Sequence, residues 1–371
     1  MRITSFFSLL YFTLIFCPFE LAAQTTEPHL PKIQTGKPNK YVLFPVIVKS
    51  PEYIWGLGAA GTFYFKLKHD SITRTSNFKA VTFYTLRKQL VFASEGYVYF
   101  PSEDFILHTI VSANHFPDKF WGIGNNTPAS NVENYAVSQF DIYPQILKNI
   151  YSDFFIGVGY EFQNIFQFSY NHDGTSLFDK ENIIGRNGGH ISGVGFIMTW
   201  DSRNNAFSPS KGFYAQYSVT NYQDYLGSNF NFLINNLDIR KYFTLPKERV
   251  IAMQFNLIST EGDVPVRDLA NIGSNSYMRG YYEGRYTDKN LTAFQTEFRT
   301  PIWKRIGAVF FTGAGKVGAR FRDLWNFDHL KPTVGMGLRF AISPKEKLNL
   351  RLDAGVGKQS HGSYLNMGEA F

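Results

Sequence analysis

A glycine-rich segment, Gly56-Leu57-Gly58-Ala59-Ala60-Gly61, has the spacing of the fingerprint that binds dinucleotide phosphates. In that motif the glycines follow a strand, open a helix and precede an acidic residue ~20 positions later. Here they run directly into a strand-like pattern at residues 62–67, and Pro51 lies just upstream. The context therefore predicts glycines inside a strand, where they leave room on one face, rather than a cofactor site.

The remaining enzyme-like patterns are equally weak. Ser208-Pro209-Ser210-Lys211 has the Ser-x-x-Lys spacing of a nucleophile and its base, but the proline predicts a turn instead of the helix that such a pair needs. The eight histidines are scattered, without two at metal-ligand spacing near an acidic partner. We therefore expect no enzymatic activity, no metal and no cofactor.

The composition favours strands. Aromatic residues make up 17% of the 371 residues and glycine occurs 31 times, a bias typical of strands and tight turns. A mean hydropathy of -0.19 leaves little room for helical membrane spans, and the aromatic content argues against disorder. The formal net charge of +7 is spread along the chain without a basic cluster, so nucleic acid is not an expected partner.

The first 23 residues are typical of a secretory signal peptide. They have a basic start, an apolar run from Phe6 to Cys17, and small residues before a cleavage site after Ala23. The only cysteine is Cys17, and the bulky Phe16 before it disfavours the alternative of a lipoprotein anchor. Residues 24–40 are polar and contain three prolines, so we expect a short periplasmic tail, followed by one domain at 41–371.

Within that domain apolar and polar residues alternate with a period of two. Between Phe154 and Tyr170 the even positions are almost all apolar, and the odd positions carry glycine and polar residues. Leu348, Leu350 and Leu352 likewise face away from Arg351 and Asp353. Such alternation gives each strand one apolar and one polar face. A soluble β-sandwich would show the same pattern, so the alternation alone does not decide the fold.

Strand length and connection length favour a membrane barrel. We assign sixteen strands, several of them near the ~9–11 residues that cross a bilayer. They begin near Tyr41, Tyr53, Ser76, Gln89, Asp104, Glu133, Tyr151, Gly189, Lys211, Ser228, Arg249, Thr292, Arg305, Pro332, Lys345 and Ser363. Tight connections (101–103, 148–149, 245–248, 303–304, 343–344) alternate with long ones (116–131, 172–188, 261–290, 321–330). The sequence therefore predicts an all-β, antiparallel transmembrane barrel with short periplasmic turns and long outer loops.

Aromatic residues beside the tight turns fit an interfacial girdle. They are Tyr99, Phe100, Phe105, Tyr143, Tyr151, Tyr242, Phe243 and Trp303. Because the strand number is even, both termini fall on the periplasmic side. Phe371 ends the last expected strand, and an aromatic residue at this position is a common terminal signal of such barrels.

The segment Asn271–Tyr286, in the longest loop, carries the most specific motif. It contains Met278-Arg279-Gly280-Tyr281, and Thr296-Glu297-Phe298-Arg299-Thr300-Pro301 follows it. With Trp200-Asp201-Ser202-Arg203 upstream, this order resembles the BamA/TamA family, the bacterial surface antigen superfamily of outer-membrane barrels. The resemblance covers essentially all of 41–371.

The resemblance implies that the sixth extracellular loop folds into the barrel lumen, where acidic groups of the inner wall hold its arginine. A guanidinium in a shielded lumen needs a carboxylate acceptor. By parity Glu297 and Asp353 face inward, so we predict that Arg279 pairs with Glu297 first and Asp353 second. Gly280 would allow a tight turn beside the wall, with Tyr281 following it. The alternative is a solvated loop arginine.

Two departures from the family pattern limit what is carried over. Gly313 stands where many relatives have aspartate, so one acidic partner of the arginine is expected to be missing. Most relatives that assemble or secrete proteins also carry soluble POTRA domains before the barrel, and residues 24–40 are too short for one. Assembly partners and client proteins are therefore implied by resemblance only.

The resemblance also implies a weak seam between the first and last strands, which relatives use as a lateral gate. Pro45 lies in the first expected strand and cannot donate a ladder hydrogen bond, and Gly368 lies in the last one. Pro45 at a β-bulge, or before the paired region, is an equal alternative.

We expect an outer-membrane protein, surrounded by lipid, that inserts or translocates outer-membrane proteins or lipids. The alternatives are a passive or ligand-specific pore, and a surface antigen whose loops bind outside partners.

Overall fold

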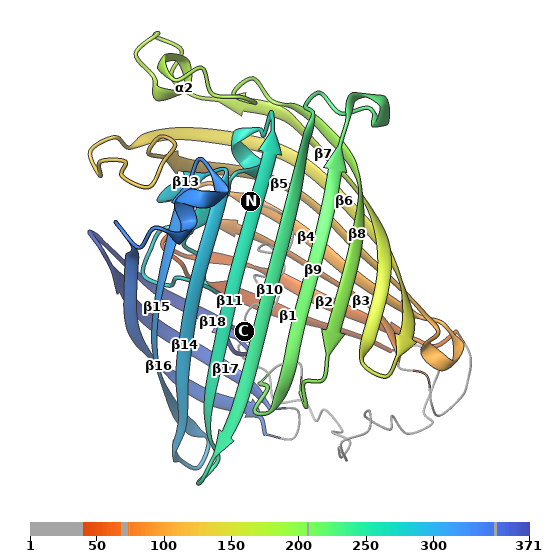
Figure 1. The fold of residues 1–371 in the computed structure, drawn as a ribbon. Coiled ribbons are helices and arrows are strands. Elements are labelled where there is room, and N and C mark those ends of the chain that lie inside the picture. The colour runs from red at the N-terminus through yellow and green to blue at the C-terminus, as the bar shows by residue number, and fades with distance from the viewer. Residues whose placement is uncertain (1–39, 68–72, 74, 206–207, 345–346) are drawn as a thin grey trace.

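The strands form one continuous antiparallel sheet that curls into a nearly closed barrel (Figure 1). The computed structural model describes residues 40–67, 73, 75–205, 208–344 and 347–371. Within these residues sixteen strands follow one another in chain order, each hydrogen-bonded to the next, and a separate pair, β12 and β13, stands apart from them. The predicted all-β barrel of sixteen strands is confirmed. The predicted signal peptide (1–23) and tail (24–40) lie outside the described residues, except for Lys40.

The strands of the barrel wall vary in length. They are β1 (Lys40–Val48), β2 (Gly56–Phe65), β3 (Ser76–Thr85), β4 (Leu90–Tyr99), β5 (Phe105–Phe120), β6 (Glu133–Tyr151), β7 (Phe154–Ser169), β8 (Gly189–Asp201), β9 (Gly212–Tyr222), β10 (Phe232–Leu245), β11 (Arg249–Gly262), β14 (Asn290–Trp303), β15 (Ile306–Gly318), β16 (Lys331–Ser343), β17 (Leu348–Gly357) and β18 (Ser360–Met367). Between β11 and β14 lie the short strands β12 (Ala270–Ile272) and β13 (Tyr286–Asp288).

In the part of the chain that the structure describes, helical structure is confined to the connections. It consists of α2 (Leu177–Lys180) and the 3-10 turns η1 (Pro101–Glu103), η2 (Asp224–Leu226), η3 (Val266–Asp268) and η4 (Phe321–Trp325). No helix in the described part of the chain is long and apolar enough to cross a membrane.

Side-chain alternation explains why these segments form a barrel wall. In β7 the residues Val158 and Tyr160 are exposed on the outer face, whereas Gly157, Gly159 and Glu161 between them are buried. A wall with an apolar outside and a polar inside suits a strand between lipid and an aqueous or protein-filled lumen. The glycines of the predicted dinucleotide-like segment lie in β2, as expected.

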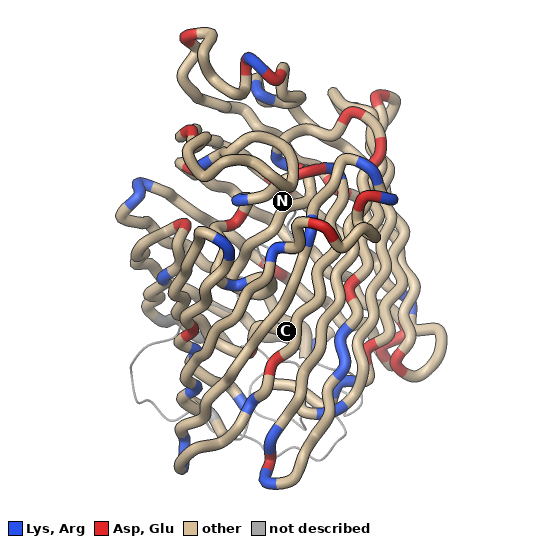
Figure 2. The backbone as a smooth tube through the Cα atoms, turned by 60° about the vertical axis from the view of Figure 1, so that its left-hand side comes forward, with Lys and Arg blue, Asp and Glu red and all other residues tan. Residues whose placement is uncertain are grey.

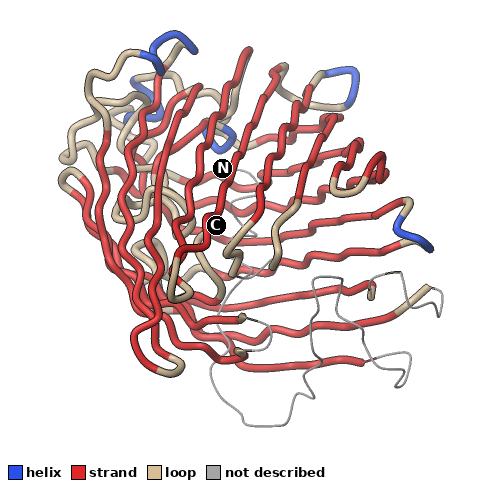
Figure 3. Tube along the Cα trace, turned by 60° about the horizontal axis from the view of Figure 1, so that its bottom comes forward, coloured by secondary structure: helices blue, strands red, loops and turns tan. Residues whose placement is uncertain are grey.

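Most long connections gather at one end of the barrel, with α2 and β13, and most tight turns at the other (Figures 1 and 3). The two-residue turn between β17 and β18 lies at the end with the long loops. Figure 2 shows that acidic and basic residues are frequent in the loops and turns of both ends.

Several predicted boundaries were wrong. β2 begins at Gly56 and not near Tyr53, because the chain turns through Ile54 with a φ of 63°. The tight turn predicted at 148–149 belongs to β6, which continues to Tyr151, and β5 extends to Phe120 beyond the predicted loop start. β5 continues because it pairs with β6 as far as Phe120 opposite Glu133, and β6 continues because Tyr151 pairs with Phe154 of β7.

The predicted aromatic girdle is correct only in part. Phe100, Phe105, Tyr151, Phe243 and Trp303 are exposed on the outside, as a girdle requires.

Tyr143 and Tyr242 are instead buried, at 7% and 2% exposure. Tyr242 pairs with Ala252 and shares the inward face of its strand with Asp238 and Arg240. Strand parity therefore places these two rings inside the barrel wall.

Candidate functional site

Arg279 is fully buried between two carboxylates that come from separate strands. Its Nη2 donates a hydrogen bond to Oε1 of Glu297 in β14, and its Nη1 donates to Oδ2 of Asp353 in β17. The guanidinium carbon also lies 3.7 Å from the centre of the Phe311 ring in β15. Burial alone would lower the pKa of Arg279, but the two carboxylates raise it above its ordinary value. The structure thus brings the loop arginine together with both acidic residues chosen from the sequence.

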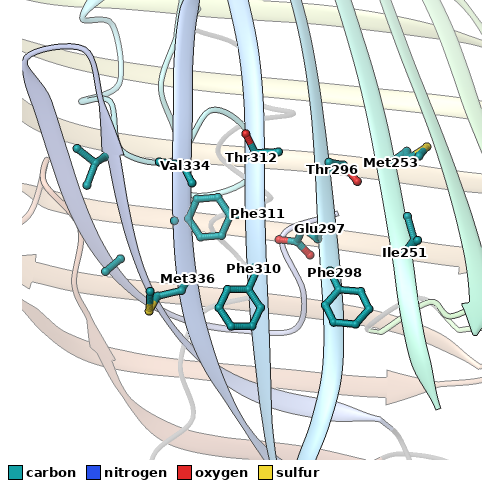
Figure 4. A pocket seen from close by; sticks show the side chains of 13 residues that line it. Ile251, Met253, Thr296, Glu297, Phe298, Phe310, Phe311, Thr312, Val334 and Met336 are labelled. Atoms are coloured by element: carbon teal, nitrogen blue, oxygen red, sulfur yellow. The ribbon is translucent and has the colours of Figure 1, made fainter. Parts of the chain in front are cut away.

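Each of those carboxylates is shared with a second arginine. Arg299 Nε donates to Glu297 Oε2 over 2.8 Å, and Arg339 Nη1 donates to Asp353 Oδ1 over 2.5 Å. Figure 4 shows this wall from close by, with the buried Glu297 and Phe311 labelled beside their outward-facing neighbours in β14 and β15. A buried arginine network with shared carboxylates fixes the relative position of the loop and of the strands that supply them.

Four members of the network, Arg299, Arg339, Arg351 and Glu369, were not among the site residues predicted from the sequence. Arg351 is buried with its Nε 3.5 Å from Asp353 Oδ2, and Glu369 Oε2 accepts a 2.7 Å hydrogen bond from Arg339 Nε. The period-two alternation places Arg339 and Arg351 on the inward face, so the sequence did contain a signal for these two residues. Nothing local marks Glu369, because it lies beyond the last strand.

Gly280 allows the loop backbone to lie directly on β17. Its φ is 107°, and a Cβ at this position would lie 2.8 Å from the backbone nitrogen of Val356. A Cβ on Gly355, opposite, would lie 2.9 Å from the carbonyl oxygen of Arg279. The Gly280 N–H donates to Tyr364 Oη in β18 over 2.9 Å. Glycine is required on both sides of this contact because the two backbones leave no space for side chains.

Tyr281 attaches the same loop to β16 and to the β17–β18 turn. Its Oη donates to the carbonyl oxygen of Pro332 and accepts from the Lys358 N–H, both over 2.7 Å. The ring lies on Gly357, where a Cβ would approach it to 2.3 Å. Arg279, Gly280 and Tyr281 therefore contact β14 and β15 on one side and β16, β17 and β18 on the other.

Most of this chain matches a known family model. The model of the Omp85 superfamily domain matches residues 75–371. The chain belongs to the Omp85 superfamily. The resemblance to BamA/TamA barrels is confirmed, and barrels of this superfamily reside in the bacterial outer membrane.

Two solved structures share the fold. BamA from Haemophilus ducreyi, in a form lacking POTRA domains 1-3, aligns with a TM-score of 0.59 and 13% identity, over 89% of this chain and 70% of its own. CdiB from Acinetobacter baumannii aligns with a TM-score of 0.57 and 12% identity, over 90% of this chain and 60% of its own. No curated protein sequence matches this chain.

In this Omp85 barrel Gln295 holds the loop backbone opposite Gly313, the position where the sequence lacks an expected aspartate. Gln295 pairs with Gly313 across β14 and β15. Its Oε1 accepts from the Met278 N–H over 3.2 Å, and its Nε2 donates to the Ser276 carbonyl oxygen over 2.8 Å. A neutral amide at this position binds both a donor and an acceptor of the loop.

The last residues of the Omp85 barrel were predicted wrongly. β18 ends at Met367, so neither Gly368 nor Phe371 belongs to the last strand. Gly368 has a φ of 76°, which turns the chain away from the strand. Phe371 is 4% exposed, its carbonyl oxygen accepts from Arg299 Nη2 over 2.8 Å, and it packs with Tyr242. The charged wall inside the barrel therefore holds the C-terminal residues.

Among the described residues, one backbone bridge joins the first and last strands of the Omp85 barrel, at the residue that follows β1. An isolated antiparallel bridge joins Lys49 to Leu365, with the Leu365 N–H donating to the Lys49 carbonyl oxygen over 3.2 Å. Pro45 lies inside β1 opposite Ala59 of β2, in an unshifted register, so it is not at a bulge. Every other neighbouring pair of barrel strands in the described chain forms a ladder.

Proposed function

We propose that this Omp85 barrel inserts or translocates outer-membrane proteins or lipids through the seam between β1 and β18, and that it is not an enzyme. The observation that carries the proposal is the single bridge at Lys49 and Leu365. Backbone N–H and C=O groups that face hydrocarbon unpaired are costly, so an unzipped edge is a place where another strand adds. Membership of the superfamily supports the same role, with client proteins and assembly machinery as partners.

The long loop (residues 263–289) supports this function over that of a passive pore. Residues 270–282 of this loop are buried, and Arg279 and Tyr281 contact strands from β14 to β18. We propose that the long loop fills the lumen and holds β17 and β18 in place beside the seam. A lumen filled in this way does not suit a freely open channel.

The experiment fixes the seam shut. Lys49→Cys with Leu365→Cys introduces a disulfide across the isolated bridge, and Ile47→Cys with Leu57→Cys provides a matched disulfide across β1 and β2, which already form a ladder. Both variants are reconstituted into vesicles, and insertion of a model outer-membrane barrel and flipping of a fluorescent phospholipid are measured. Oxidation of the seam pair is expected to abolish whichever of the two activities the reduced protein shows, barrel insertion or phospholipid flipping, and reduction is expected to restore it. Equal activity of the oxidised and reduced seam variant would contradict the proposal.

A further inference from the structure

Two cations at the loop-bearing end of the barrel share one aromatic ring. Tyr286 in β13 is 2% exposed, and its ring centre lies 4.3 Å from the guanidinium carbon of Arg285 and 4.1 Å from Nζ of Lys331. Arg285 and Lys331 are each 3% exposed. A ring face attracts a cation, but it carries no net charge and does not neutralise two of them.

Two further lysines lie close to this pair. The Lys358 N–H donates to Tyr281 Oη over 2.7 Å, and the Tyr281 ring centre is 5.9 Å from that of Tyr286. The charges of Lys316 and Lys358 both lie close enough to act on the Lys331 ammonium. Positive charge from the long loop and from three strands or turns therefore gathers around the Tyr281 and Tyr286 rings.

This cluster has no negative partner among the described residues. None of Arg285, Lys316, Lys331 and Lys358 forms an ion pair there, whereas the deeper Arg279, Arg299, Arg339 and Arg351 all do. Arg285 donates Nη1 and Nη2 to Thr127, and Lys316 Nζ donates to the Asn326 carbonyl oxygen over 2.7 Å. Arg285 and Lys331 are buried, and Lys358 beside them is exposed. Buried like charges repel one another and lose hydration, so a bound anion would stabilise this cluster.

We propose that Arg285, Lys331 and Lys358 bind a small oxyanion of the phosphate type beside Tyr286. A lysine ammonium binds a phosphate as a point charge, and the remaining guanidinium N–H groups of Arg285 supply directed donors. Lys331 lies on the same strand face as Thr333, whose hydroxyl donates to the Arg279 carbonyl oxygen, so the site opens toward the long loop and not toward lipid. A solute that enters from the loop-bearing end is therefore the expected source of the anion.

The experiment measures binding of inorganic pyrophosphate to the full barrel in zwitterionic detergent by calorimetry, at constant ionic strength. Saturable binding is expected for the wild type, with the dissociation constant raised at least about tenfold in Lys331→Met. Lys304→Met is the matched control, because Lys304 Nζ also lies on a ring, 4.7 Å from the centre of Trp303, in a turn at the other end. Its affinity is expected to equal that of the wild type.

Folding and ligand source are tested with the same variants. Without anion, Lys331→Met is expected to unfold at or above the wild-type temperature, because it removes a repulsion. A second substitution, Arg285→Gln, must weaken binding as well.

In nanodiscs, phosphatidic acid that competes with pyrophosphate would assign the anion to a lipid headgroup. Pyrophosphate binding that phosphatidic acid does not affect would assign it to a soluble ion. No binding by the wild type, or equal binding by the wild type and Lys331→Met, would overturn the proposal.

Discussion

Arg279 stabilises the docked loop through charges that the wall shares among several arginines. Removing it leaves Glu297 with Arg299 and Asp353 with Arg339, so neither carboxylate is left unpaired. The loss is therefore expected to be below the ~3–5 kcal/mol that follows when a buried charge loses its only partner. The strands of the wall therefore keep their ion pairs, whereas the long loop loses its ion pairs to the wall.

A double-mutant cycle tests the direct pair. Arg279→Ala and Glu297→Gln are expected to be non-additive by about 1–3 kcal/mol in the free energy of unfolding, because the two side chains touch. Denaturant unfolding in micelles gives the four values. Arg203→Ala with Glu297→Gln is the control, since Arg203 pairs with Asp201 and not with Glu297. Additive effects in the Arg279 cycle would show that the contact does not stabilise the barrel.

Gly280 allows a second test that needs no change of charge. Gly280→Ala is expected to destabilise loop docking by more than the ~1 kcal/mol of a strained backbone, because its Cβ would also meet Val356 at 2.8 Å. Gly284→Ala is a close control in the same loop, with a φ of 79° and its nearest atom at 3.8 Å. Protease accessibility of residues 273–285 measures docking. Equal accessibility in the two variants would contradict the close approach to β17.

At the scale of elements, the long loop contains an acidic contact that makes its docking depend on pH. The Glu283 N–H donates to Glu52 Oε1, in the β1–β2 turn, over 2.8 Å. Burial and the Glu52 carboxylate raise the pKa of Glu283 from 4.5 to about 8, with a further contribution from Asp118 and an opposing one from Arg267. The docked loop thus holds the Glu283 proton more tightly than the free loop does.

The sign of the pH effect follows from that proton. Docking is most stable below pH 4.5 and is expected to weaken as the pH rises toward about 8, because the docked carboxyl must then ionise. Hydrogen exchange of residues 277–287, corrected for intrinsic rates, measures the change. Glu283→Gln is expected to reduce the pH dependence, leaving the smaller part that comes from the raised pKa of the buried Glu52 carboxyl. Glu261→Gln, at the exposed end of β11, is expected to leave it unchanged. Protection that increases with pH in the wild type would refute this assignment.

The same elements show how far the sequence alone predicts this barrel. Alternation gives the sixteen wall strands, because strands between lipid and lumen must separate apolar from polar residues at every second position. It does not give β12 and β13, which at three residues each are too short to show a period. Nor does it give the inward turn at Gly368, which depends on charges contributed by Arg299 and Arg339 from distant strands.

The candidate site was predictable to a similar extent. Parity places Glu297 and Asp353 on the inner wall, and the loop motif supplies Arg279. The sharing of each carboxylate between two arginines is a property of the closed wall, since β14 and β17 approach the loop from different sides. Single-strand patterns carry no information about which inward charges face one another across the lumen.

At the scale of the whole molecule, the formal net charge is +7, and the buried basic residues fall into two groups, one with acidic partners and one without. The four deep arginines lie among Glu297, Asp353 and Glu369, whereas the cluster around Tyr286 has no described acidic partner. Carboxylates offset most of the positive charge inside the wall, whereas the positive charge at the loop-bearing end has no such partner and would draw anions to that end of the barrel.

The last prediction concerns the lumen itself. Sixteen-stranded barrels are wide enough to leave an aqueous channel, so the wall alone does not close the lumen, and our proposal assigns that role to the long loop. Deleting Gly273–Arg285 is expected to raise single-channel conductance in planar bilayers several-fold, because it removes Arg279 and Tyr281 together with the backbone that lies on β17. Deleting the η4 segment 320–328, which is mostly exposed, is expected to leave conductance low. High conductance in the intact barrel, unchanged by the first deletion, would mean that the long loop does not close the lumen and would favour the pore.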